Sequence, residues 1–289
     1  MIKNYFKLLR IPHWIKNVFV FVPLIFSKHL LDQEYLLQVF IGFITFSFAS
    51  SMVYVFNDLF DAEADRKHPK KKFRPIASGA VSKIEAAAII VLLIIIVSVF
   101  AFFVNTEFII IISAYVVINI FYTLYLKEVV IVDLACISSG FLLRVIGGAL
   151  IVNIYISSWL ILTTLFISVF LAVMKRRSEL VLISEHETRK VLGEYNLTFI
   201  DQISAITAAC VILCYAIYTV AEKTVEYFNT ENLVYSSIFV VFGIFRYMYL
   251  VFKKNKGENP TEVMLTDIPM IANLILYSVS VYIIIYLGK

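Results

Sequence analysis

A dense group of charged side chains follows an apolar run between Asn57 and Gly79, in the sequence NDLFDAEADRKHPKKKFRPIASG. If this segment is helical, Asp58, Asp61 and Asp65 stand at positions i, i+3 and i+7 and share one face over roughly 10 Å. Three like charges on one face repel, and a hard divalent cation such as Mg²⁺ relieves that repulsion because it selects oxygen ligands and bridges carboxylates to phosphates. The carboxylates therefore predict a metal site, with a solvated acidic helix end as the simpler alternative.

Basic side chains follow these carboxylates at Lys70, Lys71, Lys72 and Arg74. Ammonium and guanidinium donors next to a metal would hold the other side of an anionic group, and a diphosphate fits such a pairing. The alternative explanation for the lysines is the excess of positive charge that membrane proteins carry at their cytoplasmic face. Further along, Ser82 follows a glycine turn and is typical of an N-cap that starts the next helix.

A second group of charges lies in the otherwise apolar segment 127–148, KEVVIVDLACISSGFLLRVIGG. Asp133 and Arg144 are eleven residues apart in it, which is close to three helical turns, so both side chains project from one face. Ionisable residues inside a membrane span are costly and usually face a cavity or a partner. We expect Asp133 to reach a metal or a substrate hydroxyl and Arg144 to meet an anion. The alternative is that both support the helix bundle through partners on neighbouring helices.

Two further segments combine basic and hydrogen-bonding side chains. The segment 174–195, MKRRSELVLISEHETRKVLGEY, is a candidate ligand-binding loop, with a surface that faces lipid headgroups as the alternative. Near the N-terminus, HWIKN places Lys16 two residues after Trp14, either as an anchor at the membrane interface or as a ligand contact. The side chains of interest in the longer segment are Lys175, Arg176, Arg177, Glu179, Arg189, Lys190 and Tyr195.

The rest of the sequence indicates which elements must position these residues. Of 289 residues, 61% are hydrophobic and only 16% are charged, which is typical of a polytopic membrane protein. A span needs roughly 20 mostly apolar residues, and about nine such segments recur, so we expect an all-α membrane bundle with cytoplasmic cap loops. The expected spans are 15–30, 35–56, 84–104, 108–126, 131–151, 157–174, 199–221, 233–252 and 268–287.

The first of these spans is expected to be a retained helix rather than a signal peptide. Pro12 and Pro23 interrupt the candidate apolar core of a signal peptide, and no small-residue cleavage pattern follows. Most of the 25 Lys and Arg residues fall on one side of this topology. That bias places the N-terminus in the cytoplasm and the C-terminus outside the plasma (inner) membrane. The net charge of +4 reflects the same bias and gives no indication of nucleic-acid binding.

Three long, charged inner loops are expected at 57–83, 175–198 and 253–267. Loops longer than about 12 residues in a compact domain are usually functional or disordered. We therefore expect residues 1–289 to form a single integral membrane domain whose chemistry lies at the cytoplasmic face. The three cysteines lie in apolar spans without metal-ligand spacing and are expected to pack.

Taken together, these residues resemble the UbiA superfamily of intramembrane prenyltransferases, whose first signature, NDxxDxxxD, is matched from Asn57 to Asp65. Within that superfamily the chain is most similar to the decaprenyl-phosphate phosphoribosyltransferase branch. The resemblance covers nearly the whole chain and is carried by PHWIKN at 12–17, DRKHPKKKFRPIASG at 65–79, YTLYLK at 122–127, Asp133, GFLLR at 140–144, KRRSEL at 175–180 and ENPTEVMLTD at 258–267.

This resemblance implies a helix bundle around a central cavity, with Mg²⁺ bound through the first motif. It implies phosphoribosyl pyrophosphate as donor and a polyprenyl (decaprenyl-type) phosphate in the bilayer as acceptor. The product would be a precursor of cell-envelope glycans, and a homo-oligomer is left open.

The resemblance also suggests roles for individual residues. Mg²⁺ would be held by Asp58, Asp61 and Asp65, with support from Asn57. Asp133 would hold the ribose or a second metal contact. The candidate substrate contacts are Lys71, Arg74, Lys175 and Arg176 for phosphates, Tyr122 and Lys127 for the acceptor phosphate, and Lys16, Arg144, Glu179 and Tyr195.

One departure from the superfamily pattern bears on the substrate. Members that use prenyl diphosphates generally carry a second Asp-rich motif after the sixth helix, where this chain has Lys175, Arg176, Arg177 and Glu179. A donor with a separate 5-phosphate and an acceptor that is itself a phosphate bring more negative charge, so extra cations favour phosphoribosyl transfer. The alternatives are prenyl transfer to an aromatic acceptor and, from charges inside the membrane such as Arg144, a transporter or channel.

Overall fold

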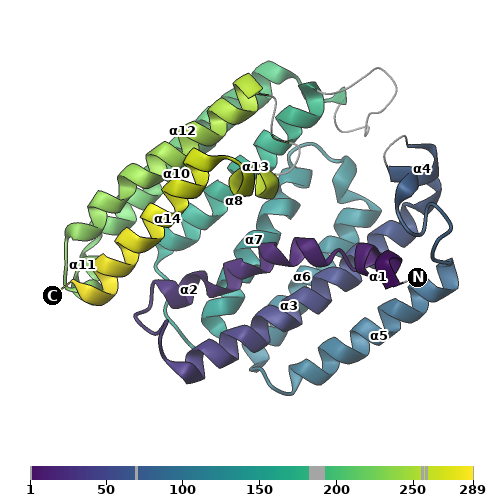
Figure 1. Cartoon of the computed structure of the whole chain (residues 1–289), viewed down its shortest axis with the longest axis horizontal. Helices are drawn as coiled ribbons and strands as arrows, with labels where there is room; N and C mark the ends of the chain where they lie inside the picture. Colours follow the sequence, from purple (N-terminus) through teal and green to yellow (C-terminus); the bar gives the residue numbers. More distant parts are fainter. Residues whose placement is uncertain (1, 69–70, 182–192, 255–256, 258–259, 289) are drawn as a thin grey trace. The chain divides into compact units, whose positions relative to one another are not determined.

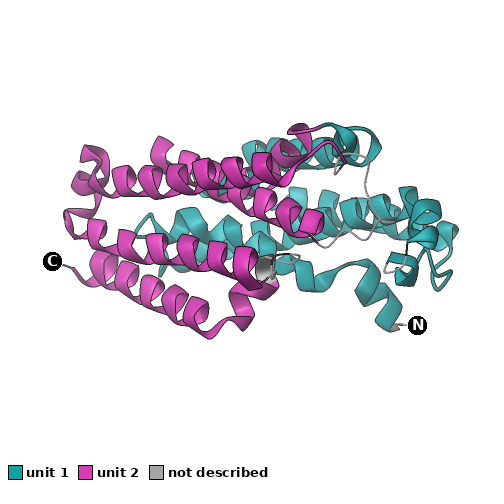
Figure 2. Ribbon diagram, turned by 90° about the horizontal axis from the view of Figure 1, so that it is seen from above, with its two compact units in different colours: residues 1–129, 143–155 teal, residues 130–142, 156–289 magenta. Residues whose placement is uncertain are grey.

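The computed structural model describes residues 2–68, 71–181, 193–254, 257 and 260–288, and over these residues it is helical without a strand (Figure 1). The expected all-α class is therefore confirmed. Residues 1–129 and 143–155 form one compact unit, and residues 130–142 and 156–289 form a second (Figure 2). The two units are described separately below.

Unit 1 contains the N-terminal helices and the second half of α7. Its elements are α1 (Ile2–Leu8), the 3-10 segment η1 (Ile11–Phe21), α2 (Val22–Ile25), α3 (Gln33–Phe60), α4 (Ala62–Lys67), η2 (Lys71–Phe73), α5 (Lys83–Ala101), α6 (Thr106–Leu124), η3 (Leu126–Glu128) and the later turns of α7 (Val132–Leu150). The expected N-cap is present, because Ser82 Oγ accepts from the Glu85 backbone N–H at 3.1 Å and Glu85 Oε2 accepts from the Ser82 N–H at 2.7 Å.

Unit 2 begins with the first turns of α7 and continues to the C-terminus. Its other elements are α8 (Ser158–Val181), α10 (Leu197–Val220), α11 (Glu222–Phe228), η4 (Asn232–Ser236), α12 (Ser237–Lys254), α13 (Pro260–Thr266), α14 (Ile268–Tyr282) and the π-helical turn η5 (Ile283–Leu287). Helices α8 and α10 pack closely, and a core around Phe170 and Tyr247 joins them to α12 and α14.

Eight helices of the described chain are long and apolar enough to cross a membrane, and they match eight of the expected spans. The ninth expected span, 15–30, differs, because its apolar residues form the shorter segment Ile11–Ile25. Pro12 and Pro23 lie in this segment, and most of it is a 3-10 helix. Proline lacks the backbone N–H that an α-helix needs, which explains why an apolar run did not become a full-length α-helix here.

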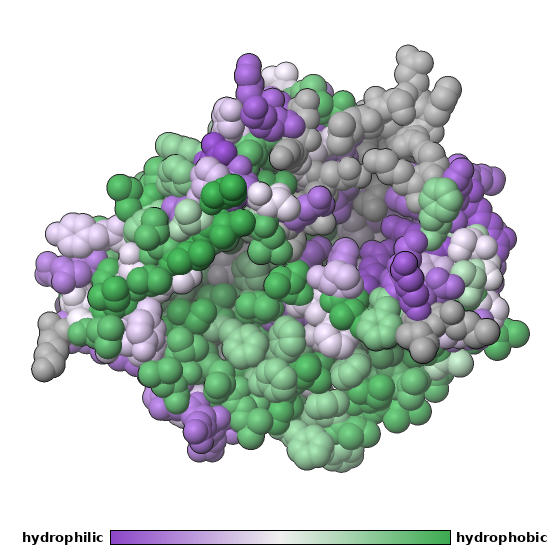
Figure 3. Space-filling view, viewed as in Figure 1, coloured by the Kyte–Doolittle hydropathy of each residue, from purple (hydrophilic) through white to green (hydrophobic). Residues whose placement is uncertain are grey.

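The core of unit 1 packs η1 against α3, α6 and α7. Phe46 and Phe108 meet edge to face with ring centroids 5.6 Å apart. At Gly148 the backbone of η1 comes so close that an added Cβ would lie 1.9 Å from the Val20 carbonyl oxygen, so only glycine fits. Apolar side chains cover much of the surface in view, as expected for a multi-pass membrane protein (Figure 3).

Candidate functional site

The carboxylates of the first motif lie where α3 passes into α4. Asp58 is in the last turn of α3, Asp61 is at the joint, and Asp65 is in α4. Helical hydrogen bonding continues across the joint, because the Asp61 N–H donates to the Asn57 carbonyl at 2.9 Å and the Asp65 N–H to the Asp61 carbonyl at 2.8 Å. The helical spacing predicted from the sequence is thus retained.

Two of these carboxylates converge on one guanidinium. Arg74 Nη1 lies 2.7 Å from Asp65 Oδ2 and 3.1 Å from Asp58 Oδ1, and both aspartates are buried. Arg10 Nη2 also donates to Asp58 Oδ1, at 2.5 Å. Positions i and i+7 lie on nearly the same side of a helix, which explains why one arginine reaches both carboxylates.

Asp61 and Asn57 meet partners from the end of α6 and the turn after it. Lys127 Nζ, in η3, donates to Asp61 Oδ1 at 2.7 Å, and Thr123 Oγ1 donates to Asn57 Oδ1 at 3.2 Å. The sequence indicated Lys127 as a substrate contact, whereas Thr123 was missed. A buried threonine near the end of an apolar helix gives no signal of its own in the sequence.

The fit of this site to a divalent cation can be judged from its donors. Among the described residues, no three Asp, Glu, His or Cys side chains stand close enough together to hold a metal as they are placed. Asp58 and Asp65 nevertheless both direct an oxygen to a single positive centre, Arg74 Nη1. Convergent carboxylate oxygens are the ligands that hard cations select, so these residues fit a divalent cation that takes the place of the guanidinium.

A second cluster lies in unit 2. Arg176 Nε in α8 donates to Asp133 Oδ2 in α7 at 2.8 Å, and both side chains are buried. Arg176 Nη1 also donates to Glu179, and Lys175 Nζ lies 3.8 Å from Glu179 Oε1. Lys175, Arg176 and Glu179 were predicted as site residues of one segment and Asp133 as part of another group. The structure brings all four together.

Tyr195 completes this cluster from just before α10. Its hydroxyl donates to Asp133 Oδ1 at 2.8 Å and accepts from the Ile131 N–H at 2.7 Å. Burial raises the pKa of Tyr195 to about 12, and the hydrogen bond and charge of Asp133 act in the same direction, so the hydroxyl stays protonated. Ile131 has a φ of 69°, which is rare for a β-branched residue and marks a strained turn at the site. Both oxygens of Asp133 are therefore engaged.

Arg144 supports the helix bundle in unit 1. Its Nε donates to Asn17 Oδ1 at 2.7 Å, its Nη2 donates to the Tyr115 hydroxyl at 3.1 Å, and the guanidinium lies 4.8 Å from the Tyr115 ring centroid. Asn17 in turn donates to Ser47 Oγ at 3.0 Å. These contacts favour the supporting role that the sequence left open, while a contact with an anion stays a prediction.

Other sequence-based candidates are more dispersed. Lys16 is half-buried in η1, Tyr122 lies in α6, and the Lys71 backbone N–H in η2 donates to His68 Nδ1 at 3.3 Å. Their predicted substrate contacts stay predictions. Three candidate basic residues, Lys70, Arg189 and Lys190, lie outside the described residues.

Arg177 is fixed by partners within unit 2. Its Nε donates to Asp201 Oδ1 at 2.7 Å, and its guanidinium lies 3.9 Å from the ring centroid of Phe252. The sequence marked Arg177 only as one member of a basic run. The structure separates it from Arg176, which faces Asp133.

A cavity of about 290 Å³ lies beside Asp58 in unit 1. It is lined by Lys7, Arg10, Pro12, His13, Asp58, Arg74 and Pro75. In the sequence, Lys7 and Arg10 are explained by the charge bias across the membrane, and His13 belongs to the motif HWIKN. None of the three was predicted as a site residue.

The fold and these clusters define a multi-pass membrane protein with buried acid–base groups on two sets of helices. Residues 18–266 match the UbiA prenyltransferase family. The chain is 30% identical to a decaprenyl-phosphate phosphoribosyltransferase of Mycolicibacterium smegmatis (92% of this chain, 87% of the relative) and 31% identical to one of Mycobacterium tuberculosis (90% and 87%).

The chain therefore belongs to the UbiA prenyltransferase family and is a transferase. Its fold matches the solved structure of a UbiA homolog from Archaeoglobus fulgidus bound to GPP and Mg²⁺. The TM-score is 0.69 over 98% of this chain and 99% of that one, at 16% sequence identity. At that identity the likeness concerns the fold alone.

Proposed function

We propose that this transferase moves 5-phosphoribose from phosphoribosyl pyrophosphate to a polyprenyl phosphate in the membrane, in a Mg²⁺-dependent reaction. The observation that carries the proposal is the group in the last turns of α8, where Lys175, Arg176 and Glu179 stand in place of the second acidic motif expected for prenyl-diphosphate donors. The names of the relatives from Mycolicibacterium smegmatis and Mycobacterium tuberculosis support the same donor and acceptor classes.

The chain's own residues would divide the work between binding and positioning. Asp58, Asp61 and Asp65 would hold Mg²⁺. When bound, this cation would offset the negative charge that develops on the leaving diphosphate. Arg74, Lys71 and Lys175 are the candidates for direct phosphate contacts, since guanidinium and ammonium groups donate charge-assisted hydrogen bonds.

Asp133 and Tyr195 would act through Arg176. Asp133 accepts from both partners and is buried, so it holds the guanidinium in one orientation. An oriented cation in a site from which water is excluded stabilises developing negative charge without reorganising during the reaction. This makes Asp133 and Tyr195 positioning residues in the proposed reaction.

The transfer itself exchanges one carbon–oxygen bond for another. The bond from C1 of the ribose to the diphosphate breaks, the diphosphate leaves with the electron pair, and an oxygen of the lipid phosphate forms the new bond to C1. The lipid phosphate is already anionic at neutral pH, so no residue has to remove a proton from it. Catalysis then depends on positioning and electrostatic stabilisation.

We further propose that residues 1–289 act as one transferase domain in the plasma (inner) membrane. The N-terminus and the reacting groups would face the cytoplasm, and the C-terminus would lie outside. The Lys and Arg distribution supports this orientation. Reporter fusions at the two termini test it, and a cytoplasmic C-terminus would contradict it.

The substrate proposal is tested with the purified full chain, ribose-labelled phosphoribosyl pyrophosphate and a polyprenyl phosphate. We expect the label to move into the lipid extract with Mg²⁺ and to stay in the aqueous phase with EDTA. No lipid-linked label in the presence of Mg²⁺ would overturn the donor and acceptor assignment.

A further inference from the structure

The cavity beside Asp58 has an unusual balance of charge. Three basic side chains line it, those of Lys7, Arg10 and Arg74, and among the described residues Asp58 is the one carboxylate in its lining. Asp61 and Asp65 belong to the same motif but do not line the cavity. The cavity is therefore distinct from the pairing of Asp61 with Lys127 and presents an excess of cationic donors.

The two arginines are held together by one carboxylate oxygen. Asp58 Oδ1 lies 2.5 Å from Arg10 Nη2 and 3.1 Å from Arg74 Nη1. Arg10 adopts a left-handed backbone conformation, with φ 50° and ψ 43°, and its guanidinium lies 4.8 Å from the ring centroid of Tyr54. A strained non-glycine residue persists where the surrounding structure holds it, so the turn fixes the direction of Arg10.

These cations retain hydrogen-bonding capacity. A guanidinium has five N–H donors, yet Arg10 uses only Nη2 and Arg74 only Nη1 towards other described residues. Lys7 Nζ donates one of its three hydrogens, to the Phe73 carbonyl at 2.7 Å. Two guanidiniums converging on a single oxygen repel each other, and a second anion would relieve that repulsion.

We propose that the Lys7–Arg10–Arg74 cavity binds a phosphate monoester. A monoester carries a charge of about −1.5 to −2 at neutral pH and three acceptor oxygens. These suit three basic side chains whose charge Asp58 and Asp65, the latter 2.7 Å from Arg74 Nη1, offset only in part. The inference rests on the proposed function, in which two monoesters take part, namely the 5-phosphate of the donor and the phosphate of the lipid acceptor. The chemistry of the site is the same for either source.

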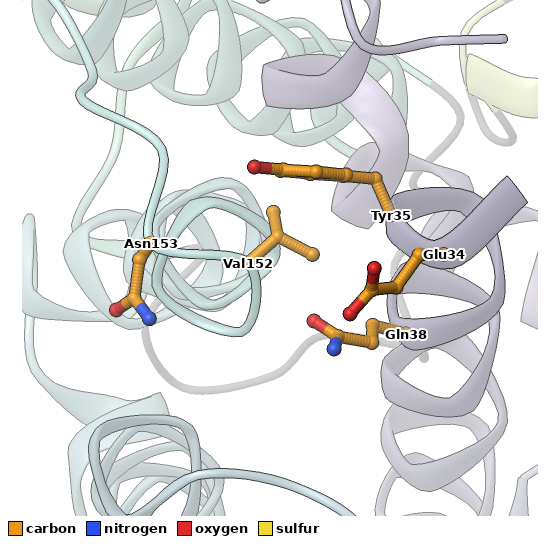
Figure 4. Close-up of a pocket in the computed structure, with 5 residues that line it drawn as sticks. All are labelled: Glu34, Tyr35, Gln38, Val152 and Asn153. Carbon is orange, nitrogen blue, oxygen red and sulfur yellow. The ribbon is translucent and has the colours of Figure 1, made fainter. Parts of the chain in front are cut away.

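A second cavity in unit 1 has a different balance of charge. It measures about 280 Å³ and is lined by Glu34, Tyr35, Gln38, Val152 and Asn153, near the start of α3 (Figure 4). Its lining, among the residues that the structure describes, has a carboxylate and two amides but no basic side chain. The concentration of positive charge is therefore a property of the cavity at the opposite end of α3.

The test replaces Lys7 by Gln and uses Lys3→Gln as the matched control, because Lys3 lies on the same short helix and is exposed outside the cavity. Kinetics are measured with phosphoribosyl pyrophosphate and with a ribose 1-diphosphate that lacks the 5-phosphate. We expect Lys7→Gln to lower kcat/KM for transfer from phosphoribosyl pyrophosphate roughly tenfold, as loss of one charge-assisted hydrogen bond implies. Lys7→Arg, which keeps the charge, should restore most of it.

Kinetics with the two donors and with the acceptor show whether the cavity binds the 5-phosphate of the donor or the phosphate of the lipid. A loss confined to the donor that carries the 5-phosphate assigns the cavity to that group. A roughly tenfold rise in KM for polyprenyl phosphate with both donors assigns it to the lipid. Kinetics of Lys7→Gln that match those of Lys3→Gln for every substrate overturn the proposal while leaving the proposed function in place.

A measurement without turnover separates this proposal from the proposed function. Ribose 5-phosphate, a soluble monoester, should raise the Tm of the detergent-solubilised chain and of Lys3→Gln, and this rise should be lost in Lys7→Gln. If this pattern of Tm changes is found but the unaltered protein does not transfer phosphoribose, the monoester site is supported and the proposed reaction is rejected. An equal rise in Tm for Lys3→Gln and Lys7→Gln, or no rise in the unaltered chain, would overturn the site.

Discussion

Arg176 Nε donates to Asp133 Oδ2 at 2.8 Å, and both side chains are almost completely shielded from solvent. A buried charge is tolerated when its partner is present and becomes costly when that partner is removed. The pair therefore links α7 and α8 within unit 2, and it orients the cation that we place in the reaction.

Removing either member should destabilise the protein. We expect Arg176→Gln to lower the free energy of unfolding by about 3–5 kcal/mol, because it leaves the buried Asp133 carboxylate without a positive partner. Asp133→Asn should cost less, because Arg176 keeps its pair with Glu179. Thermal unfolding in detergent measures the effect. Asp201→Asn is the control, since its pair with Arg177 is partly exposed and should contribute at most about 1 kcal/mol. Equal losses for the buried and the exposed pair would contradict this assignment.

Tyr195→Phe should remove one donor from Asp133 without removing a charge. We expect a loss of about 1–3 kcal/mol in the free energy of unfolding. The folded pKa of about 12 lies above the ordinary value of 10, so the contribution is complete below pH 10 and is lost as the pH rises through 12. The difference in Tm from the unaltered protein should thus be constant from about pH 6 to 9. A difference that shrinks across that range would show that the hydroxyl ionises earlier.

Asp58→Asn and Asp61→Asn should abolish transfer while leaving folded protein in the membrane. Either amide keeps the shape of the side chain but removes a charge that we assign to Mg²⁺ binding. Glu63→Gln is a suitable control, because Glu63 is an exposed neighbour in α4 that pairs with Lys83 at 3.1 Å. Product formation is measured at saturating Mg²⁺, and near-normal turnover by Asp58→Asn or Asp61→Asn would remove metal binding by that residue from the mechanism.

Arg74 and a divalent cation should compete for the same oxygens. Because Arg74 Nη1 contacts both Asp58 and Asp65, Arg74→Gln should free Asp65 and leave Asp58 paired with Arg10 alone. We expect this loss of a competing cation to strengthen the binding of Mn²⁺ several-fold. An electron paramagnetic resonance titration without donor isolates this effect from phosphate binding. Lys72→Gln, at an exposed neighbouring position, provides the comparison. Weaker Mn²⁺ binding in Arg74→Gln than in this control would show that the carboxylates do not form a cation site.

Residue types and local spacing in the sequence indicated most of the groups in both clusters, but not their partners. For Asp133 the sequence left open a metal or substrate contact and a partner on a neighbouring helix. The structure shows partners in Arg176 and Tyr195, which are 43 and 62 residues away in the chain. Helical periodicity places side chains on a face and carries no information about contacts at such separations. The contacts of Asp133 with Arg176 and Tyr195 therefore became visible only in the folded chain.

Lys7 and Arg10 show a second reason why the sequence did not predict the whole site. In the sequence they are explained by the charge bias across the membrane, and nothing local distinguishes them from other basic residues. The left-handed turn at Arg10 and the 48-residue separation from Asp58 are tertiary features. The apolar content of the segment at 15–30 likewise predicted a span, whereas the 3-10 geometry around its prolines shortened it.

The central claim is that this family member transfers phosphoribose rather than a prenyl group, and one competition experiment tests it most directly. The purified chain receives phosphoribosyl pyrophosphate, a prenyl diphosphate, a polyprenyl phosphate and an aromatic acceptor together with Mg²⁺, and the products are identified by mass spectrometry. We expect a polyprenyl-phosphoryl-phosphoribose, diphosphate released in equal amount, and the prenyl diphosphate left intact. A prenylated aromatic product, with phosphoribosyl pyrophosphate unconsumed, would contradict it.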